Sequence, residues 1–367
     1  MKYKFEDIIF NITEKKKPVE EDKYNYIGLE HLESGNLFIS KWGSDTAPEG
    51  EKIVMKKGDV LFGKRRAYQK KVAISPIDGI FSAHGMVLRP KENVICKEFL
   101  PFFISSEAFL NEAIRISVGG LSPTVNWKDI KELEFDLPSL AEQKVLAEKL
   151  WAAYEVKQSY LKMIAATEEM VKAQFVEMFG NPVTNTKGWA TMSISEVAPE
   201  EPSKDKTKGS VWILNLDMIE SNTGKVIDKI FEEDSNLLSV APFDEGNVLY
   251  SKLRPYLNKV VIPDGKGYAT TELVPLRPKQ DKLNLTFFSH LLRSSNFVSF
   301  ANGIATGTKM PRMPLNDLRK FKCILPPLNL QREFEAIAEQ ADKSISELRK
   351  SVDAIDKVIK SLINENL

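Results

Sequence analysis

The sequence predicts an α+β protein made of two similar mixed α/β domains separated by two long helices. Three observations carry this prediction. The second half of the chain repeats the first at a constant offset of 188 residues (246 − 58 = 188), each copy alternates β-rich runs with turns, and each leads into a long segment without Gly or Pro. Two copies of this length indicate a duplicated domain with pseudo-two-fold symmetry and not a solenoid.

The repeat runs from position 58 to position 143 without an insertion. The matched residues include a glycine, an arginine, a tyrosine and two lysines of a basic segment. They also include the prolines that precede the long helices. The pairs are Gly58 with Gly246, Lys64 with Lys252, Arg66 with Arg254, Tyr68 with Tyr256, Lys71 with Lys259, Pro123 with Pro311, Pro138 with Pro326, Leu140 with Leu328 and Gln143 with Gln331.

The mixed domains are expected at residues 1–138 and 181–326. Strands are predicted from runs such as KIVMKKGDVLFG, KKVAI and GMVLRP in the first copy, and VAPFDEGNVLY, KVVIP and LVPLRP in the second. FLPFFISSEAFLNEAI and LTFFSHLLRSSNFVSFA are expected to be helical. Each domain is long enough to bury a core of its own.

The long helices are expected within residues 139–180 and 327–367, from about Ala141 to Phe179 and from about Asn329 to Asn364. Proline precedes each of them, and Gly180 follows the first. The second helix has an unbroken 4-3 apolar seam, which is typical of a coiled coil. Its members are Phe334, Ala338, Ala341, Ile345, Leu348, Val352, Ile355, Ile359 and Leu362.

The connectivity favours an antiparallel pair of helices. The first helix must deliver the chain to the second domain, and the second helix can then return along it. The first seam, Leu146, Leu150, Ala153, Lys157, Tyr160, Ile164, Thr167, Val171 and Gln174, is polar at three points. Packing of each helix on its own domain is the alternative. At about 1.5 Å per residue such a pair would act as a spacer between the domains.

Composition limits the class of protein. The 51 basic and 51 acidic residues give a net charge of zero, so a nucleic-acid-binding chain would have to concentrate its positive charge on one surface. The two cysteines are too few for a disulfide framework. We find no signal peptide and no membrane-spanning run, so a cytoplasmic chain is expected.

A basic segment with an embedded tyrosine is the first candidate DNA-binding site, and it occurs in both copies. Arginine offers a planar fork to guanine or phosphate, lysine a point charge, and tyrosine a hydroxyl or a stacking face. The alternative is an exposed hairpin whose charges are only solvated. The candidates are Lys64, Arg65, Arg66, Tyr68, Lys70 and Lys71 in the first copy, and Lys252, Arg254, Tyr256 and Lys259 in the second.

Glycine-containing loops are the second candidate. ISVGGLSPTVNW corresponds to IATGTKMPRMPL, and small residues with amide and hydroxyl donors allow close approach to a phosphate or a base edge. A tight connection into the next strand is the alternative. The candidates here are Ser122, Thr124, Thr308, Lys309 and Arg312.

The sequence motifs of several enzyme classes are incomplete. GDVLFGKR has the glycine and lysine spacing of a phosphate loop, but Arg65 replaces the Ser or Thr that holds magnesium. His31, His84 and His290 share no metal-ligand spacing and are interpreted as structural. We therefore expect no catalytic residue, no metal site and no cofactor site in this chain.

The Pro-x-Leu-x-x-Gln start of each long helix and the repeated G-x-V-L-x-x-K-x-R-x-Y element give the chain a family resemblance. It resembles the specificity subunit of type I restriction-modification systems over essentially its whole length. The second helix start, Asn-Leu-Gln-Arg, lacks the Glu of the family's usual Glu-Gln pair.

The resemblance implies two target-recognition domains, each reading one half of a split, asymmetric site in double-stranded DNA. It implies no catalysis by this chain. The partners would be two methyltransferase subunits, which bind S-adenosylmethionine, and in the full enzyme two restriction subunits that use ATP and Mg²⁺. A stand-alone DNA-binding regulator and a coiled-coil protein scaffold are the alternatives.

Overall fold

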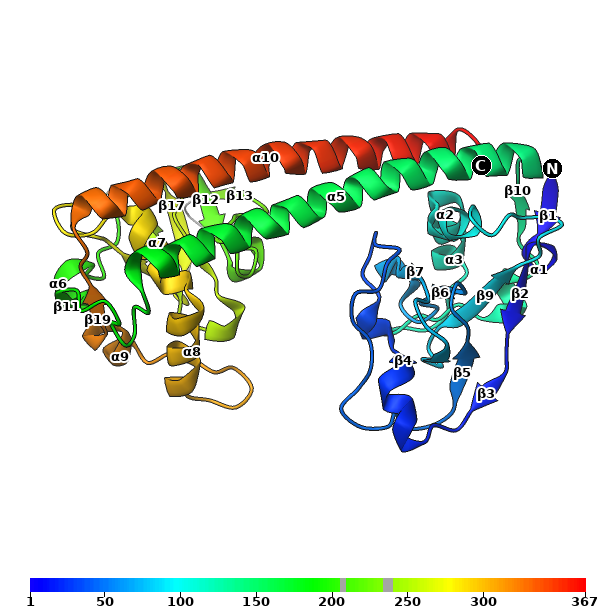
Figure 1. The fold of residues 1–367 in the computed structure, drawn as a ribbon, viewed down its shortest axis with the longest axis horizontal. Helices are drawn as coiled ribbons and strands as arrows, with labels where there is room; N and C mark the ends of the chain where they lie inside the picture. The colour runs from blue at the N-terminus through cyan, green and yellow to red at the C-terminus, as the bar shows by residue number, and fades with distance from the viewer. Residues whose placement is uncertain (205–208, 234–239) are drawn as a thin grey trace. The chain divides into compact units, whose positions relative to one another are not determined.

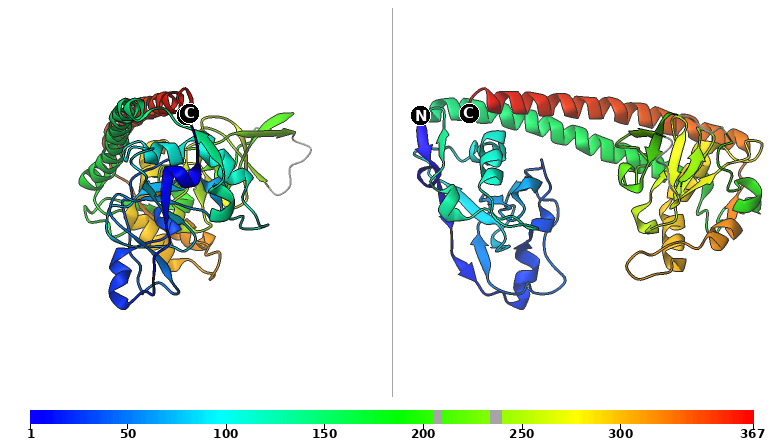
Figure 2. Two further views of the ribbon diagram at one scale, coloured as in Figure 1. Left: turned by 90° about the vertical axis from the view of Figure 1, so that its right-hand side faces the viewer. Right: turned by 180° about the vertical axis from the view of Figure 1, so that it is seen from behind.

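The computed structural model describes residues 1–204, 209–233 and 240–367, and these divide into two compact units (Figure 1). Unit 1 comprises Met1–Leu161 and Arg349–Leu367, and unit 2 comprises Lys162–Leu348. Each unit contains one mixed domain and part of both long helices. Both chain ends belong to unit 1 and lie at the same end of it (Figure 2), where the Met1 amino group donates to the Leu137 carbonyl at 2.8 Å.

Unit 1 contains two four-stranded sheets and a strand pair. Neighbouring strands are antiparallel except for β4 and β8, which are parallel. The pair is β1 (Lys2–Lys4) with β10 (Glu134–Asp136); the first sheet is β2 (Ile9–Ile12), β9 (Met86–Pro90), β6 (Val60–Phe62), β7 (Val72–Ile74); the second is β3 (Lys15–Lys16), β5 (Lys52–Met55), β8 (Gly79–Phe81), β4 (Tyr26–Ile27).

Unit 2 repeats most of this topology, but its β16-β15-β18 sheet has three described strands where unit 1 has four. Its one parallel contact among the described strands, between β12 and β17, stands where β4 meets β8 in unit 1. The added strand β13 at the sheet edge has no described counterpart in unit 1. The groups are β11 (Thr191–Ser193) with β19 (Lys322–Ile324); β16 (Val260–Val261), β15 (Val248–Ser251), β18 (Leu273–Leu276); and β13 (Ile230–Glu233), β12 (Ser210–Leu214), β17 (Gly267–Thr270), β14 (Val240–Phe243).

The two stretches predicted to be helical each form two helices. Ser106 and Ser294 cause the break, because each has an extended backbone and caps the following helix through its hydroxyl, which accepts from Phe109 N at 3.1 Å and Phe297 N at 3.3 Å. The helices are α2 (Leu100–Ser105), α3 (Glu107–Arg115), α7 (Leu285–Arg293) and α8 (Ser295–Ile304). Single-turn helices α1 (Phe5–Ile8), α4 (Trp127–Ile130) and α6 (Ile194–Val197) and the six-residue α9 (Leu315–Lys320) complete the set.

The long helices are α5 (Leu140–Phe179) and α10 (Leu328–Asn364), within one residue of the predicted bounds. Gly180 ends α5 with a φ of 75°, a left-handed conformation that glycine adopts without steric cost.

A buried glutamine fastens each long helix to its domain. In unit 1 the Gln143 side chain accepts from Cys96 N at 2.9 Å and donates to the carbonyls of Val94 at 2.9 Å and Pro138 at 3.0 Å. In unit 2 Gln331 makes the same three bonds 188 residues later, to Asn284 N, the Lys282 carbonyl and the Pro326 carbonyl. The Pro-x-Leu-x-x-Gln motif is thus a structural joint.

The helices are antiparallel within each unit, as predicted. In unit 1, Lys157 of α5 pairs with Asp356 of α10 at 2.6 Å, so one of the three polar points in the first seam is an interhelical ion pair. Ile363 enters the same core as Leu146. In unit 2, the Phe334 ring of α10 lies 5.4 Å from Phe175 and 5.6 Å from Phe179 of α5.

Candidate nucleic-acid interface

The basic segment of each unit folds into the same tight turn. In unit 1, β6 leads into the short 3-10 turn η3 (Ala67–Gln69), with Arg66 (φ 57°) and Lys70 (φ 50°) left-handed on either side. In unit 2, Arg254 (φ 49°) and Asn258 (φ 49°) flank η6 (Pro255–Leu257). The turn exposes one tyrosine at its tip: Tyr68 is 52% exposed and Tyr256 50%.

The glycine-containing loop pairs with this turn in both units. In unit 1, Arg66 N donates to Pro123 O at 2.6 Å and Val125 N donates to Lys64 O at 3.0 Å. In unit 2, Arg254 N donates to Pro311 O at 2.7 Å and Met313 N to Lys252 O at 2.9 Å. The loops turn at Gly119 (φ 117°) and Gly307 (φ 100°). The two candidate segments therefore form one surface per unit, which we call interface 1 (residues 64–71 and 118–124) and interface 2 (residues 252–259 and 306–312).

On interface 1 the arginines are held by neighbouring polar groups. Arg65 contacts the His84 ring, with Nη1 to Nε2 at 3.2 Å, and Arg66 Nε donates to the Ser122 hydroxyl at 3.2 Å. Thr124 donates to the Ser122 carbonyl at 3.2 Å. Arg66, Tyr68 and Lys70 are exposed, whereas Lys64 is half-buried, and burial lowers its pKa.

On interface 2 the side chains are arranged differently. Arg312 forms an ion pair with Glu272 at 2.8 Å. Met310 stands where unit 1 has Ser122, and within the described residues nothing accepts from the buried Arg254 Nε. Thr308 and Lys309 are exposed on the loop, as is Tyr256 on the turn, and Lys252 is half-buried.

One predicted lysine in each unit serves the fold. The Lys71 ammonium donates to the Leu29 carbonyl at 2.7 Å, and the Lys259 ammonium donates to the Leu216 carbonyl at 2.6 Å. Burial lowers the pKa of Lys259. These contacts join the basic turn to the adjacent 3-10 segments η2 (Leu29–His31) and η4 (Leu216–Met218).

A third segment brings His84, which the sequence indicated only as a structural histidine, beside interface 1. His84 and Glu272 occupy equivalent positions, 188 residues apart, and each contacts an arginine of its own interface. Burial and the charges of Arg65, Lys64 and Lys52 lower the pKa of His84, so its ring is neutral at pH 7. The signal was the mismatch of a His and a Glu at equivalent positions beside the repeated motif.

The acid within the first basic segment points away from interface 1. The Asp59 side chain, only 4% exposed, binds Arg89 through two bonds of 2.8 and 2.7 Å. In unit 2 the equivalent Arg277 binds Asp244 at 2.8 Å, and position 247 is Asn. Neither carboxylate neutralises the basic turn.

Among the described residues there is no group of His, Cys, Asp and Glu side chains able to hold a metal ion. None of the helices in this part of the chain has the length and apolar content to cross a membrane. Cys96 and Cys323 are buried free thiols.

Comparison with known proteins shows the family of this chain. A family model described as "Type I restriction modification DNA specificity domain" matches residues 2–159 and 186–355. The chain belongs to this family. As a member of the type I specificity family it is a DNA-recognition chain, which agrees with the resemblance seen in its sequence.

The chain is also similar in sequence to specificity subunits of two type I restriction enzymes. The chain is 24% identical over 345 residues to the type I restriction enzyme EcoDI specificity subunit of Escherichia coli, covering 82% of this chain and 72% of that one. It is 22% identical over 391 residues to the MjaVIII specificity subunit of Methanocaldococcus jannaschii, covering 98% and 89%.

The fold of the chain also matches solved structures. A chain from a structure described as "Structural basis underlying complex assembly and conformational transition of the type I R-M system" aligns with a TM-score of 0.54. The alignment has 20% identity and covers 100% of this chain and 97% of that one. At this identity the likeness concerns the fold.

Proposed function

We propose that this chain reads a split, asymmetric site in double-stranded DNA, with interface 1 reading one half and interface 2 the other. The observation that carries the proposal is that the same backbone surface is built twice, with different side chains on it. Backbone contacts position a reader, and side chains carry its sequence preference. Arg65 beside His84 and Arg312 beside Glu272 therefore favour unlike half-sites.

The partners follow from the same proposal. Two methyltransferase subunits dock on the chain and bind S-adenosylmethionine, and two restriction subunits with ATP and Mg²⁺ complete the full enzyme in the cytoplasm. The chain itself supplies recognition and no catalytic group. Its lack of overall positive charge is consistent with partner subunits contributing phosphate contacts.

Co-expression with a type I methyltransferase subunit from the same organism tests the proposal. We expect a stable complex that methylates adenine within one bipartite sequence, detected by mapping modified adenines in the host genome. A chain that binds no DNA in the presence of that subunit would refute the proposal. DNA binding without such a partner would favour a stand-alone regulator, and a complex without DNA affinity would favour a scaffold.

Substitution of Arg66 and Arg254 tests whether each interface recognises a different half-site. Arg66→Ala should relax recognition of one half-site and Arg254→Ala recognition of the other, each by about 1–3 kcal/mol of discrimination. Arg115→Ala and Arg319→Ala remove exposed arginines outside both interfaces and should leave the recognised sequence unchanged. Equal loss on all DNA sequences would make Arg66 and Arg254 phosphate contacts.

A further inference from the structure

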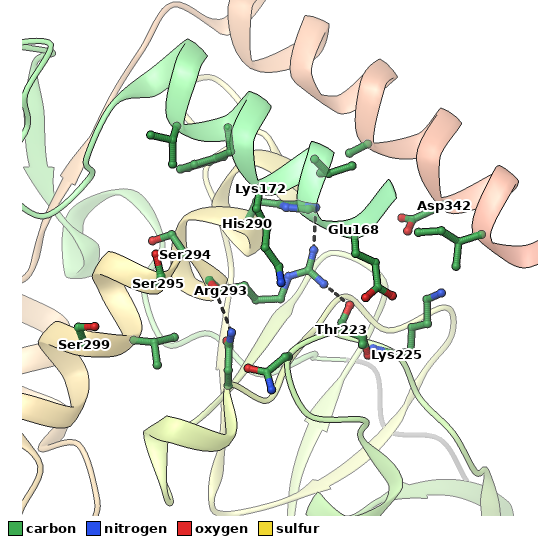
Figure 3. Close-up of a pocket in the computed structure, with 18 residues that line it drawn as sticks. Glu168, Lys172, Thr223, Lys225, His290, Arg293, Ser294, Ser295, Ser299 and Asp342 are labelled. Atoms are coloured by element: carbon green, nitrogen blue, oxygen red, sulfur yellow. Dashed lines mark hydrogen bonds between the residues drawn. The ribbon is translucent and has the colours of Figure 1, made fainter. Parts of the chain in front are cut away.

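Unit 2 contains a cavity of about 310 Å³, which touches interface 2 only at Asn258 (Figure 3). Its other walls come from α5, α7, α8, α10 and the loop at residues 222–225, all within unit 2. One side is apolar and the other polar. The apolar lining includes Val171, Phe175, Val176, Val298, Ala338 and Ile345.

An arginine side chain crosses the polar side of this cavity. Arg293 donates through Nη1 to the Thr223 carbonyl and contacts His290 through Nη2, which lies 2.7 Å from Nε2. Burial, and then the charge of Arg293, lowers the pKa of His290 well below its ordinary value. The ring is therefore neutral, and its Nε2 accepts the hydrogen bond. A guanidinium carries five N–H groups, so donors remain for a ligand.

One donor of the Arg293 guanidinium, Nε, is buried and has no hydrogen-bond partner among the described residues. Asp342 and Glu168 also line the cavity, and their charges act on Arg293. Figure 3 shows Asp342 on the α10 side, apart from the guanidinium. Burial lowers the pKa of Arg293, which reflects the cost of holding this cation away from water.

Unit 1 fills the corresponding space with aromatic rings. Tyr154 is 3% exposed, packs 5.8 Å from Trp151 and 5.3 Å from Phe38, and its hydroxyl donates to Asn36 Oδ1 at 2.9 Å. Phe102 lies 4.9 Å from Trp151. These rings form a closed core under α5.

Unit 2 has polar residues at those positions. At an offset of 188, Phe102 becomes His290, Trp151 becomes Glu339 and Tyr154 becomes Asp342. Lys225 is the counterpart of Phe38, because each lies five residues after the Glu of a Glu-Ser pair, Glu33-Ser34 in unit 1 and Glu220-Ser221 in unit 2. His290, Asp342 and Lys225 line the cavity, whereas Glu339 is exposed and lies outside its lining. The cavity therefore occupies positions where unit 1 has Phe102, Tyr154 and Phe38, and it contains a buried cation.

We propose that this cavity binds a small aromatic carboxylate, with its ring against Phe175 and Val171 and its carboxylate on Arg293. An aromatic ring restores the packing that unit 1 obtains from Tyr154 and Phe102, and a carboxylate satisfies the guanidinium by charge-assisted hydrogen bonds. The carboxylates of Glu168 and Asp342 in the same lining favour a singly charged ligand over a phosphate.

Methyl NMR of the full-length chain with 4-hydroxyphenylacetate as the probe tests this proposal. We expect saturable shifts of the Val171, Val298 and Ile345 methyl signals, in the absence of DNA. Arg293→Gln should weaken binding by about tenfold or more, because a hydrogen bond to a charged group is lost. Asp342→Tyr restores the unit 1 residue and should abolish binding by filling the cavity.

The controls separate the site from general effects. Asp353→Tyr makes the same substitution at an exposed position of α10 and should leave the affinity unchanged. In the unaltered chain, 4-methylphenol lacks the carboxylate and should bind about tenfold more weakly. Absence of saturable shifts, equal affinity for both probes, or binding that survives Asp342→Tyr would each overturn the proposal. None of these outcomes depends on the proposed reading of DNA.

Discussion

At the scale of single residues, the two interfaces carry different side chains at equivalent backbone positions. His84 and Glu272 occupy one structural position, yet a neutral imidazole and a carboxylate affect the adjacent arginine in opposite ways. Glu272 pairs with Arg312 and restricts it, whereas His84 leaves the positive charge of Arg65 available. Interface 1 is thus the more electropositive of the two at this point.

DNA binding should depend on the protonation of His84. Its pKa in the free chain is below the ordinary 6.5, and a nearby phosphate would raise it by favouring the protonated ring. Affinity should then rise as the pH falls between the bound and free pKa values, by at most about tenfold per pH unit for one proton. Fluorescence anisotropy of the DNA complex measures this slope.

Two variants show whether His84 is the group that takes up this proton. His84→Ala should flatten the pH dependence below neutrality, and Arg319→Ala should preserve it. A slope that persists in His84→Ala would assign the proton to another group.

The buried glutamines should be important for stability. Gln143→Ala leaves Cys96 N and two carbonyls without their partner, which we expect to lower the free energy of unfolding by about 2 kcal/mol or more. Gln331→Ala should have a similar effect in unit 2. Urea denaturation measures both, with exposed Gln340→Ala as the control, expected within about 0.5 kcal/mol of the unaltered chain.

Sequence reasoning at this scale identified residue types but not the directions of side chains. Lys70 and Lys71 are adjacent and looked equivalent, yet Lys70 is exposed and the Lys71 ammonium binds a backbone carbonyl. His84 was interpreted only as a structural residue, because the chain between β8 and β9, which carries it to Arg65, belongs to no motif. Long-range strand order places it there.

At the scale of elements, the same turn with two left-handed residues occurs in both units. A left-handed conformation costs a non-glycine residue about 1 kcal/mol, and each turn has two such residues. The glycine loop offsets this cost by pairing with the turn through main-chain hydrogen bonds. This arrangement keeps the tyrosine exposed in both turns and the arginine exposed in unit 1.

Lys70→Gly should therefore stabilise the chain by up to about 1 kcal/mol, since glycine adopts a φ of 50° without strain. The same variant should weaken DNA binding by removing an exposed charge. Gln69→Gly, one position earlier at an ordinary φ, should instead destabilise by about 0.5–1 kcal/mol. Thermal unfolding of both variants distinguishes the two effects, and destabilisation by Lys70→Gly would show that the turn is not strained.

The long helices were predictable to within one residue because their signals are local: a preceding proline, an apolar seam and a following glycine. The shorter helices were predicted as two and not four, since Ser106 and Ser294 cap from within apolar runs. The edge strand β13 had no local signal, and all four of its residues are exposed.

At the scale of the whole molecule, the duplication predicts that the helical spacer sets the gap between half-sites. Removing seven residues from both α5 and α10 shortens a helix by about 10 Å, or about three base pairs at ~3.4 Å each. The recognised gap should decrease accordingly, as read from methylated sites. Deletion from one helix alone should prevent folding or assembly, and an unaltered gap after the double deletion would refute the spacer.

The carboxylate that binds the equivalent arginines Arg89 and Arg277 comes from different sequence positions in the two copies. Arg89 is bound by Asp59, whereas Arg277 is bound by Asp244, the counterpart of Lys56, and Asn247 stands in place of Asp59. A recombinant domain with residues up to 57 from one copy and residues from 246 onward from the other would contain no acid for its arginine. The reciprocal hybrid would contain two. Exchange of half-site specificity between such domains is therefore expected to succeed only when the crossover leaves residues 56–89, or 244–277, together.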